Sequence, residues 1–375
     1  MSPRCHHEEP GQNAPKVRSG VERALRRSVP MLRTLALIVV TAASLDRPAN
    51  VATAFVANAL DGTVSVVDVR TGASRATVPV GCDPRDVVAH PDGSRVYVAN
   101  TCADDLDAAP GSVSVIDTAT NAVVDTIPVP FGPIALAIDA SRQRLYAACL
   151  VEVPFSDEDA SGVLYVADLE TGGPVDQLPL FLVPRDLVLS ADGSRAFVSG
   201  VVGSRDDNDV VHLSFSGVRT IGIEGGTDGP TYRGASGPLD VHPSGQTLYV
   251  LDQATDELAV VDTGAMAEVA RVPVGVAPQD VLVHSRARRV FVSSAGDNPN
   301  ALPDVVTAID SKRNLLAGTF DAGATPVGMA AVPRSSLLLA TNFYSGTLRV
   351  MRARTGKLVR TIPVGAGADA VAVVR

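Results

Sequence analysis

The sequence predicts an all-β protein, a ring of seven four-stranded antiparallel blades that forms a seven-bladed β-propeller. The first observation is composition: 46% of the residues are hydrophobic but only 4% are aromatic, with 32 Gly and 26 Pro. A chain rich in β-branched and turn residues is typical of many short strands. The second observation is a repeated unit, and the third is that the two chain ends complete each other.

The repeated unit begins at a proline that precedes an apolar strand. A turn such as Pro-Asp-Gly at 91–93 follows, then a second strand (96–99), a variable loop, a third strand (113–117) and a fourth (126–129). Such a sheet cannot bury both of its faces alone, so the units are expected to stack around an axis. The anchoring prolines are Pro84, Pro133, Pro184, Pro238, Pro278 and Pro326.

The chain ends supply the seventh blade. The segment from residue 52 opens directly with a second strand, whereas residues 365–375 form a first strand with nothing after it. One composite blade built from both ends would close the ring and leave no open sheet edge. The propeller is therefore expected to span residues 51–375.

Residues 1–50 are expected to be an N-terminal tail that contains a signal peptide. Within residues 31–43, a short apolar run follows Arg33 and ends in the small residues 41–43. This order predicts export, to the periplasm or outside the cell, with cleavage near Ala43. The run is too short for a comfortable transmembrane anchor. Two alternatives stay open: translation starting at Met31 rather than Met1, and a disordered cytoplasmic tail.

The segments VYVAN (96–100), VSVIDT (113–118) and TIPV (126–129) resemble the Tyr-Val-Thr-Asn repeat of the YVTN (YncE-like) β-propeller family. The family occurs in exported and surface proteins of bacteria and archaea. The resemblance covers essentially all of 51–375 and implies the same fold, but the family is functionally mixed and implies no activity. The repeat Asn is present at Asn58, Asn100 and Asn342 and is replaced by Cys149, Gly200 and Asp252.

Loops that join successive blades, or the second strand of a blade to its third, share one face of a propeller, here called the top face. Four of them, 100–112, 149–162, 200–209 and 293–304, are long and acidic. Long loops on a rigid scaffold often bind ligands, so we expect an acidic top face that attracts a cation, Ca²⁺ or a cationic partner. The alternative is that these charges only keep the protein soluble. The acidic residues are Asp104, Asp105, Asp107, Asp157, Glu158, Asp159, Asp206, Asp207 and Asp209.

The best candidate ligand-binding site is the channel mouth, where the residues after each anchor enter the innermost strand. Four blades place an Asp at the same step, and two of these place an Arg before it. Because side chains alternate along a strand, only one of each Arg–Asp pair is expected to face the channel. The alternative is that each Asp caps its own loop by accepting backbone N–H groups. The candidate residues are Asp86, Asp186, Asp240, Asp280, Arg85 and Arg185.

The cysteines allow a disulfide on the top face. Cys82 and Cys102 belong to the same blade, and export would permit a bond between them. Cys149 occupies the corresponding region of the next blade, so a bond between Cys102 and Cys149 is also possible, and the count cannot decide. A free third thiol is expected in either case.

Three functions fit these observations. We expect an exported, non-enzymatic binding or scaffold protein, a monomer that holds a protein or small molecule at its top face and channel mouth. The formal net charge of −9 argues against nucleic acid. One alternative is a lactonase- or lyase-like propeller enzyme that uses channel carboxylates and a divalent metal such as Ca²⁺; no other cofactor is predicted. The other is an accessory partner of a redox protein. The sequence contains no Cys-x-x-Cys-His, Gly-x-Ser-x-Gly or phosphate-loop motif.

Overall fold

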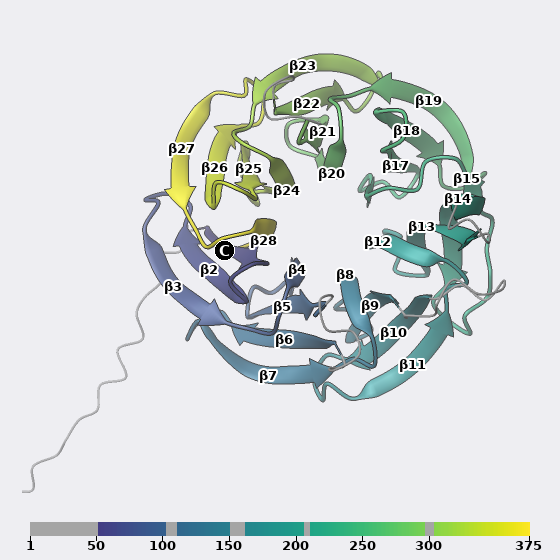
Figure 1. Ribbon diagram of the computed structural model, residues 1–375, viewed down its shortest axis with the longest axis horizontal. Helices are drawn as coiled ribbons and strands as arrows, with labels where there is room; N and C mark the ends of the chain where they lie inside the picture. The colour runs from purple at the N-terminus through teal and green to yellow at the C-terminus, as the bar shows by residue number, and fades with distance from the viewer. Residues whose placement is uncertain (1–51, 103–110, 151–161, 206–210, 297–303) are drawn as a thin grey trace, which may run out of the picture. The chain divides into compact units, whose positions relative to one another are not determined.

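The computed structural model describes residues 52–102, 111–150, 162–205, 211–296 and 304–375, all within one compact unit, Arg47–Arg375. These residues form seven four-stranded antiparallel sheets around a central channel (Figure 1), which confirms the predicted seven-bladed β-propeller. In this part of the chain, no helix has the length and apolar character needed to cross a membrane.

Blade 1 joins the two ends of the propeller. Strand β28 (Ala368–Val374) pairs antiparallel with β1 (Thr53–Asn58), which continues into β2 (Thr63–Asp68) and β3 (Ser74–Pro79). The predicted composite blade is therefore present, and it closes the ring beside the C-terminus (Figure 1).

The other six blades follow in chain order, each from the channel outward. Blade 2 contains β4 (Pro84–Ala89), β5 (Arg95–Asn100), β6 (Ser112–Asp117) and β7 (Ala122–Pro128). Blade 3 contains β8 (Gly132–Asp139), β9 (Arg144–Leu150), β10 (Gly162–Asp168) and β11 (Pro174–Pro179). Blade 4 contains β12 (Val183–Leu189), β13 (Arg195–Arg205), β14 (Val211–Gly222) and β15 (Tyr232–Arg233).

Blades 5 to 7 repeat this order. Blade 5 contains β16 (Leu239–Val241), β17 (Thr247–Asp252), β18 (Glu257–Asp262) and β19 (Ala267–Pro273). Blade 6 contains β20 (Pro278–His284), β21 (Arg289–Ser294), β22 (Val305–Asp310) and β23 (Leu315–Asp321). Blade 7 contains β24 (Pro326–Ala331), β25 (Leu337–Asn342), β26 (Thr347–Arg352) and β27 (Leu358–Pro363).

The core consists of seven apolar clusters, one between each pair of neighbouring blades. Six clusters contain an aromatic side chain from the same register position of the second strand, and the cluster between blades 7 and 1 has Leu339 there. These rings lie between blades and are almost wholly buried, so they fill a large part of the space between neighbouring sheets. The six are Phe55, Tyr97, Tyr146, Phe197, Tyr249 and Phe291.

The repeat Asn has a structural role. Asn100 is fully buried at the end of β5, and its Nδ2 donates to the hydroxyls of Ser112 (3.0 Å) and Ser114 (2.9 Å) on β6. Gly81, which enters blade 2, packs against it: a Cβ at Gly81 would lie 2.6 Å from Asn100 Cγ. Gly365 packs in the same way on Asn58. The Asn and the Gly therefore hold the entrances of blades 1 and 2 together.

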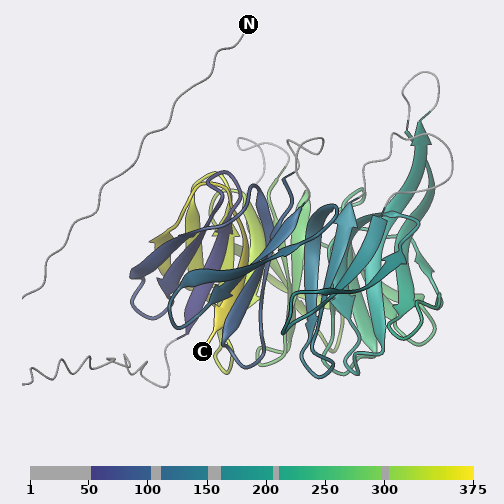
Figure 2. The same ribbon diagram turned by 90° about the horizontal axis from the view of Figure 1, so that it is seen from below.

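Blade 4 differs from the sequence prediction in two places. The segment 200–209, predicted as a loop, is partly strand, because β13 runs to Arg205 and β14 starts at Val211. The two strands form a long ribbon that rises beyond the other blades (Figure 2, teal-green). The outer strand β15 has only two residues and lies in a Gly-rich segment (224–236), whereas the fourth strand of the repeated unit is longer, as at 122–128.

Candidate functional site

Inner strands begin with a β-bulge at the channel mouth. The register between β4 and β5 shifts between Pro84 and Asp86, and the same shift occurs at Pro184/Asp186 and at Pro278/Asp280. A bulge breaks the strict alternation of side chains. The expectation that only one residue of each Arg–Asp pair faces the channel is therefore wrong for blade 2, where Arg85 and Asp86 both line the channel cavity.

The channel carboxylates link neighbouring blades. Oδ1 of Asp86 accepts the N–H of Val87 (2.7 Å), and Oδ2 accepts the N–H of Leu136 in blade 3 (2.7 Å). Asp186 accepts from Leu187 (2.7 Å) and from Leu239 of blade 5 (2.8 Å). Each of these two Asp side chains therefore accepts one backbone N–H from its own strand and a second one from the next blade.

Asp280 repeats this link, since its Oδ2 accepts the N–H of Met329 in blade 7 (2.7 Å). Asp240 links blades too, through the N–H of Val283 in blade 6 (2.7 Å), but it does so at a different level.

Asp240 does not occupy the step of the other three. Asp240 lies opposite Tyr249 on the neighbouring strand. Asp86 lies opposite Ala99, which is two residues beyond Tyr97, the residue of blade 2 that is equivalent to Tyr249. Asp240 therefore lies two residues farther along the channel. The prediction of four equivalent Asp residues is wrong at this position, because Pro238 enters its blade two residues later than the other anchors.

These carboxyl groups resist ionisation. Burial raises the pKa of Asp86 and of Asp240 to about 6, although backbone hydrogen bonds lower both. Burial, with the charges of Asp86 and Asp240, raises the pKa of Asp186 to about 7. The pKa of Asp280 is raised well above its usual range by burial and by the charges of Asp186 and Asp240. The four groups therefore form one electrostatically coupled set.

A cavity of about 280 Å³ opens at the channel mouth. The closing blade contributes Asp369 to it, a buried residue whose pKa is raised to about 7 by burial, against the opposing charge of Arg85. The guanidinium of Arg85 forms ion pairs with the carboxylates of Asp83 (Nε to Oδ1, 2.8 Å) and Asp369 (Nη1 to Oδ2, 3.5 Å). The polar side chains that line the cavity are Arg85, Asp86, Asp186, Gln279, Asp280 and Asp369.

Arg185 does not join this group. Its side chain is exposed, it does not line the cavity, and it makes none of the ion pairs among the described residues. Asp369 and Gln279 line the cavity but are not among the candidate residues predicted from the sequence. Asp369 stands one residue earlier in its strand than Asp86 does, so an alignment on the Asp step does not select it. Its place beside Arg85 depends on ring closure.

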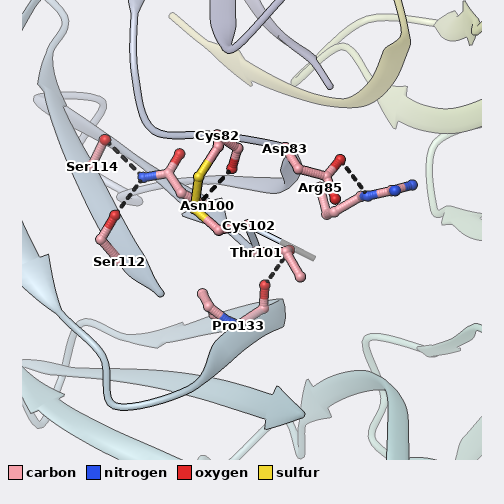
Figure 3. The surroundings of a disulfide bond; sticks show 9 residues. All are labelled: Cys82, Asp83, Arg85, Asn100, Thr101, Cys102, Ser112, Ser114 and Pro133. Atoms are coloured by element: carbon pink, nitrogen blue, oxygen red, sulfur yellow. Dashed lines mark hydrogen bonds and ion pairs between the residues drawn. A yellow bond between two sulfur atoms is a disulfide. The ribbon is translucent and has the colours of Figure 1, made fainter. Parts of the chain in front are cut away.

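Cys82 and Cys102 form a disulfide in the structure (Figure 3), the first of the two pairings considered. It fixes the loop that carries Asp83 and Arg85, together with the backbone bond from Thr101 N–H to Asp83 (3.1 Å). Cys149 is free and buried, and burial raises the pKa of its thiol to about 12.

The acidic residues of the top loops lie outside the described residues, so the structure places none of Asp104, Asp105, Asp107, Asp157, Glu158, Asp159, Asp206, Asp207 and Asp209. Among the residues that are described, no three His, Cys, Asp or Glu side chains form a group that could hold a metal ion. Each channel carboxylate instead links a different pair of neighbouring blades.

No protein-family model and no curated protein matches the chain. Solved structures do resemble it. Hydrazine synthase from Kuenenia stuttgartiensis has a TM-score of 0.64 at 19% identity, over 80% of this chain and 92% of that one. A functionally unknown protein from Desulfotomaculum acetoxidans DSM 771 also reaches 0.64, at 14% identity, over 86% and 99%. The dihydro-heme d1 dehydrogenase NirN, in complex with DHE, reaches 0.60 at 14% identity, over 85% and 74%. These likenesses support the propeller fold, and membership of the YVTN (YncE-like) family stays a prediction.

Proposed function

We propose that this protein is an exported, non-enzymatic binding protein whose channel mouth receives a positively charged group. The ligand class is an organic cation, an ammonium or guanidinium group from a small molecule or from a partner's Lys or Arg side chain. The signal-like segment 31–43 and the disulfide support export, since disulfides persist in oxidising compartments.

One observation carries the proposal: the channel mouth gathers carboxyl groups whose ionisation is unfavourable. Burial raises the pKa values of Asp86, Asp186 and Asp369 to about 6 to 7, and neighbouring carboxylates add to this rise at Asp186 and Asp369. Arg85 alone among the residues lining the cavity brings a positive charge. A bound cation would stabilise the ionised forms, so these groups favour a positively charged ligand.

The experiment is calorimetric titration at low salt, at pH 8 and at pH 5, with three probes: arginine amide, putrescine and CaCl₂. We expect an organic cation to bind at pH 8 and to bind at least about tenfold more weakly at pH 5, where the carboxyl groups hold protons. Absence of binding by both organic probes at millimolar concentration would contradict the proposal. Calcium binding alone would instead favour the lactonase- or lyase-like alternative.

Two variants should change the affinity for the organic cation in opposite directions. Asp369→Asn removes a cavity charge without removing a backbone acceptor, so it should weaken binding. Arg85→Gln removes the competing cation, so it should strengthen binding, each by about three- to tenfold. Asp321→Asn, at the outer strand β23, is the matched control and should change nothing.

The names of two similar structures, hydrazine synthase and dihydro-heme d1 dehydrogenase, agree with the alternative of a redox partner. At 19% and 14% identity they carry the fold alone. Cation binding at the channel mouth therefore remains the proposed function.

A further inference from the structure

A basic cavity lies at the other end of the blades, away from the channel mouth. The inner strand β20 runs from Pro278 at the mouth to His284, and the turns beyond its end belong to the opposite face. There, a cavity of about 410 Å³ opens between turns of blades 6 and 7. Its lining residues are Ala287, Arg288, Arg289, Asp310, Lys312, Arg313 and Arg354.

Five of these seven side chains are cationic, and only Asp310 is acidic. They come from three turn regions that are distant in sequence: Arg288 and Arg289 at the start of β21, Lys312 and Arg313 between β22 and β23, and Arg354 between β26 and β27. The propeller fold brings them together. A basic cavity is unusual on a chain whose formal net charge is −9.

None of the cations of the cavity makes a close ion pair with a carboxylate among the described residues. Elsewhere in that part of the chain, arginines such as Arg75, Arg144 and Arg271 each contact a carboxylate at 2.6 to 2.8 Å. None of the five cavity cations makes such an ion pair, and their hydrogen-bonding groups are available to a ligand. An acidic ligand would meet them without first breaking an ion pair.

Asp310 offsets only one of the five positive charges of the cavity, and the turn holds its carboxylate in place. Its Oδ1 accepts the backbone N–H groups of Lys312 (3.0 Å) and Arg313 (2.9 Å). Those bonds, followed by the charges of Arg313 and Arg288, hold the pKa of Asp310 below its usual value. The local field around this turn is therefore positive.

The turn does not need its cations to form. The same Asp-capped turn recurs in blade 2, where Asp117 accepts from Ala119 and Thr120, and in blade 5, where Asp262 accepts from Gly264 and Ala265. The equivalent turns of blades 1 and 3 have Arg70 and Glu170 at the position of Lys312. Among these five Asp-capped turns, only that of blade 6 has cations at both positions, so the turn geometry does not require the pair.

We propose that this basic cavity binds a compact, multiply charged oxyanion, a molecule with two or more phosphate or carboxylate groups. Arginine pairs with both groups through parallel N–H···O bonds. Convergent cations in a concave site raise the local concentration of anions. This site is separate from the channel mouth, and it stands whether or not cations bind there.

The test is calorimetric titration of the full chain with pyrophosphate and with citrate at low ionic strength. Binding should weaken as salt is added. Tighter binding of pyrophosphate would identify phosphate as the preferred group, and tighter binding of citrate would identify carboxylate. Failure of both anions to bind at millimolar concentration would overturn the proposal.

Arg313→Gln and Arg354→Gln should each weaken binding about tenfold, as expected for loss of a charge-assisted hydrogen bond. Arg334→Gln is the control, an exposed turn arginine of blade 7 that does not line the cavity. Equal weakening by the control would show that net charge alone attracts the anion and would overturn the proposal. Unchanged affinity in a double variant that combines Arg313→Gln with Arg354→Gln would overturn it too. Arg313→Gln and Arg354→Gln change exposed side chains, so neither should change the melting temperature.

Discussion

At the scale of single residues, the channel aspartates combine two tasks. Asp86 accepts one backbone N–H from its own strand and one from Leu136 of the next blade, and it also borders the cavity. The two tasks oppose each other energetically. The hydrogen bonds favour the ionised carboxylate, whereas burial favours the protonated carboxyl group. The pKa of Asp86 is raised, which shows that burial has the larger effect.

The first prediction concerns the link between blades. Asp86→Ala leaves the N–H groups of Val87 and Leu136 without their acceptor, so we expect a loss of about 1–3 kcal/mol in the free energy of unfolding. Urea denaturation at pH 7 measures it. Asp176→Ala is the matched control: this exposed residue on β11 accepts only from the neighbouring Gln177 (2.8 Å) and should cost far less. Equal losses in the two variants would contradict a link specific to the channel.

At the scale of elements, the blade interface is the unit of stability. Each interface has its own cluster, and the ring at the common position of the second strand is the largest side chain in most of them. Phe291 illustrates this, because it is fully buried between blades 6 and 7 among residues such as Met329 and Met351.

The second prediction follows from this packing. Phe291→Ala removes a large buried ring, so the free energy of unfolding should fall by about 3–5 kcal/mol. Phe181→Ala is the control: this ring is 52% exposed, and its main described contact is with the guanidinium of Arg219 at 5.4 Å. Its removal should cost no more than about 1 kcal/mol. A small effect of Phe291→Ala in urea denaturation would show that the interface can collapse around the gap.

At the scale of the whole molecule, the repeats made the fold predictable and the sites only partly so. The anchoring prolines and the complementary chain ends predicted seven blades and the composite closure, both of which the structure has. The register of Asp240 could not be predicted, because Pro238 enters its blade two residues late. The basic cavity was missed for a similar reason. Its cations come from three separate turns, and only the ring places them together.

The third prediction is a pH dependence of the whole propeller. Asp86, Asp186 and Asp369 have folded-state pKa values of about 6 to 7, above the ordinary value of 3.8. Their stabilising contribution is complete below pH 3.8 and is lost as the pH rises through about 6 to 7. The melting temperature should therefore fall by a few degrees between pH 5 and pH 8.

The control for this prediction is Asp369→Asn, which removes one titrating group, so its melting temperature should fall less over the same range. Comparing the two proteins also cancels the opposite contribution of His284, whose pKa is lowered by burial and which destabilises the fold as it gains a proton. A variant that loses as much stability as the wild type would contradict the assignment to the channel.

The closing strand has a consequence for how the protein is made. Strand β28 (residues 368–374) is synthesised after all other strands of the propeller, yet it pairs with β1, the first of them. Until those residues leave the ribosome, blade 1 lacks its innermost strand and β1 presents an unpaired edge. A chain truncated before residue 368 would thus yield an open ring that is prone to aggregation. Closure of the propeller therefore requires that all of its other strands have already been synthesised.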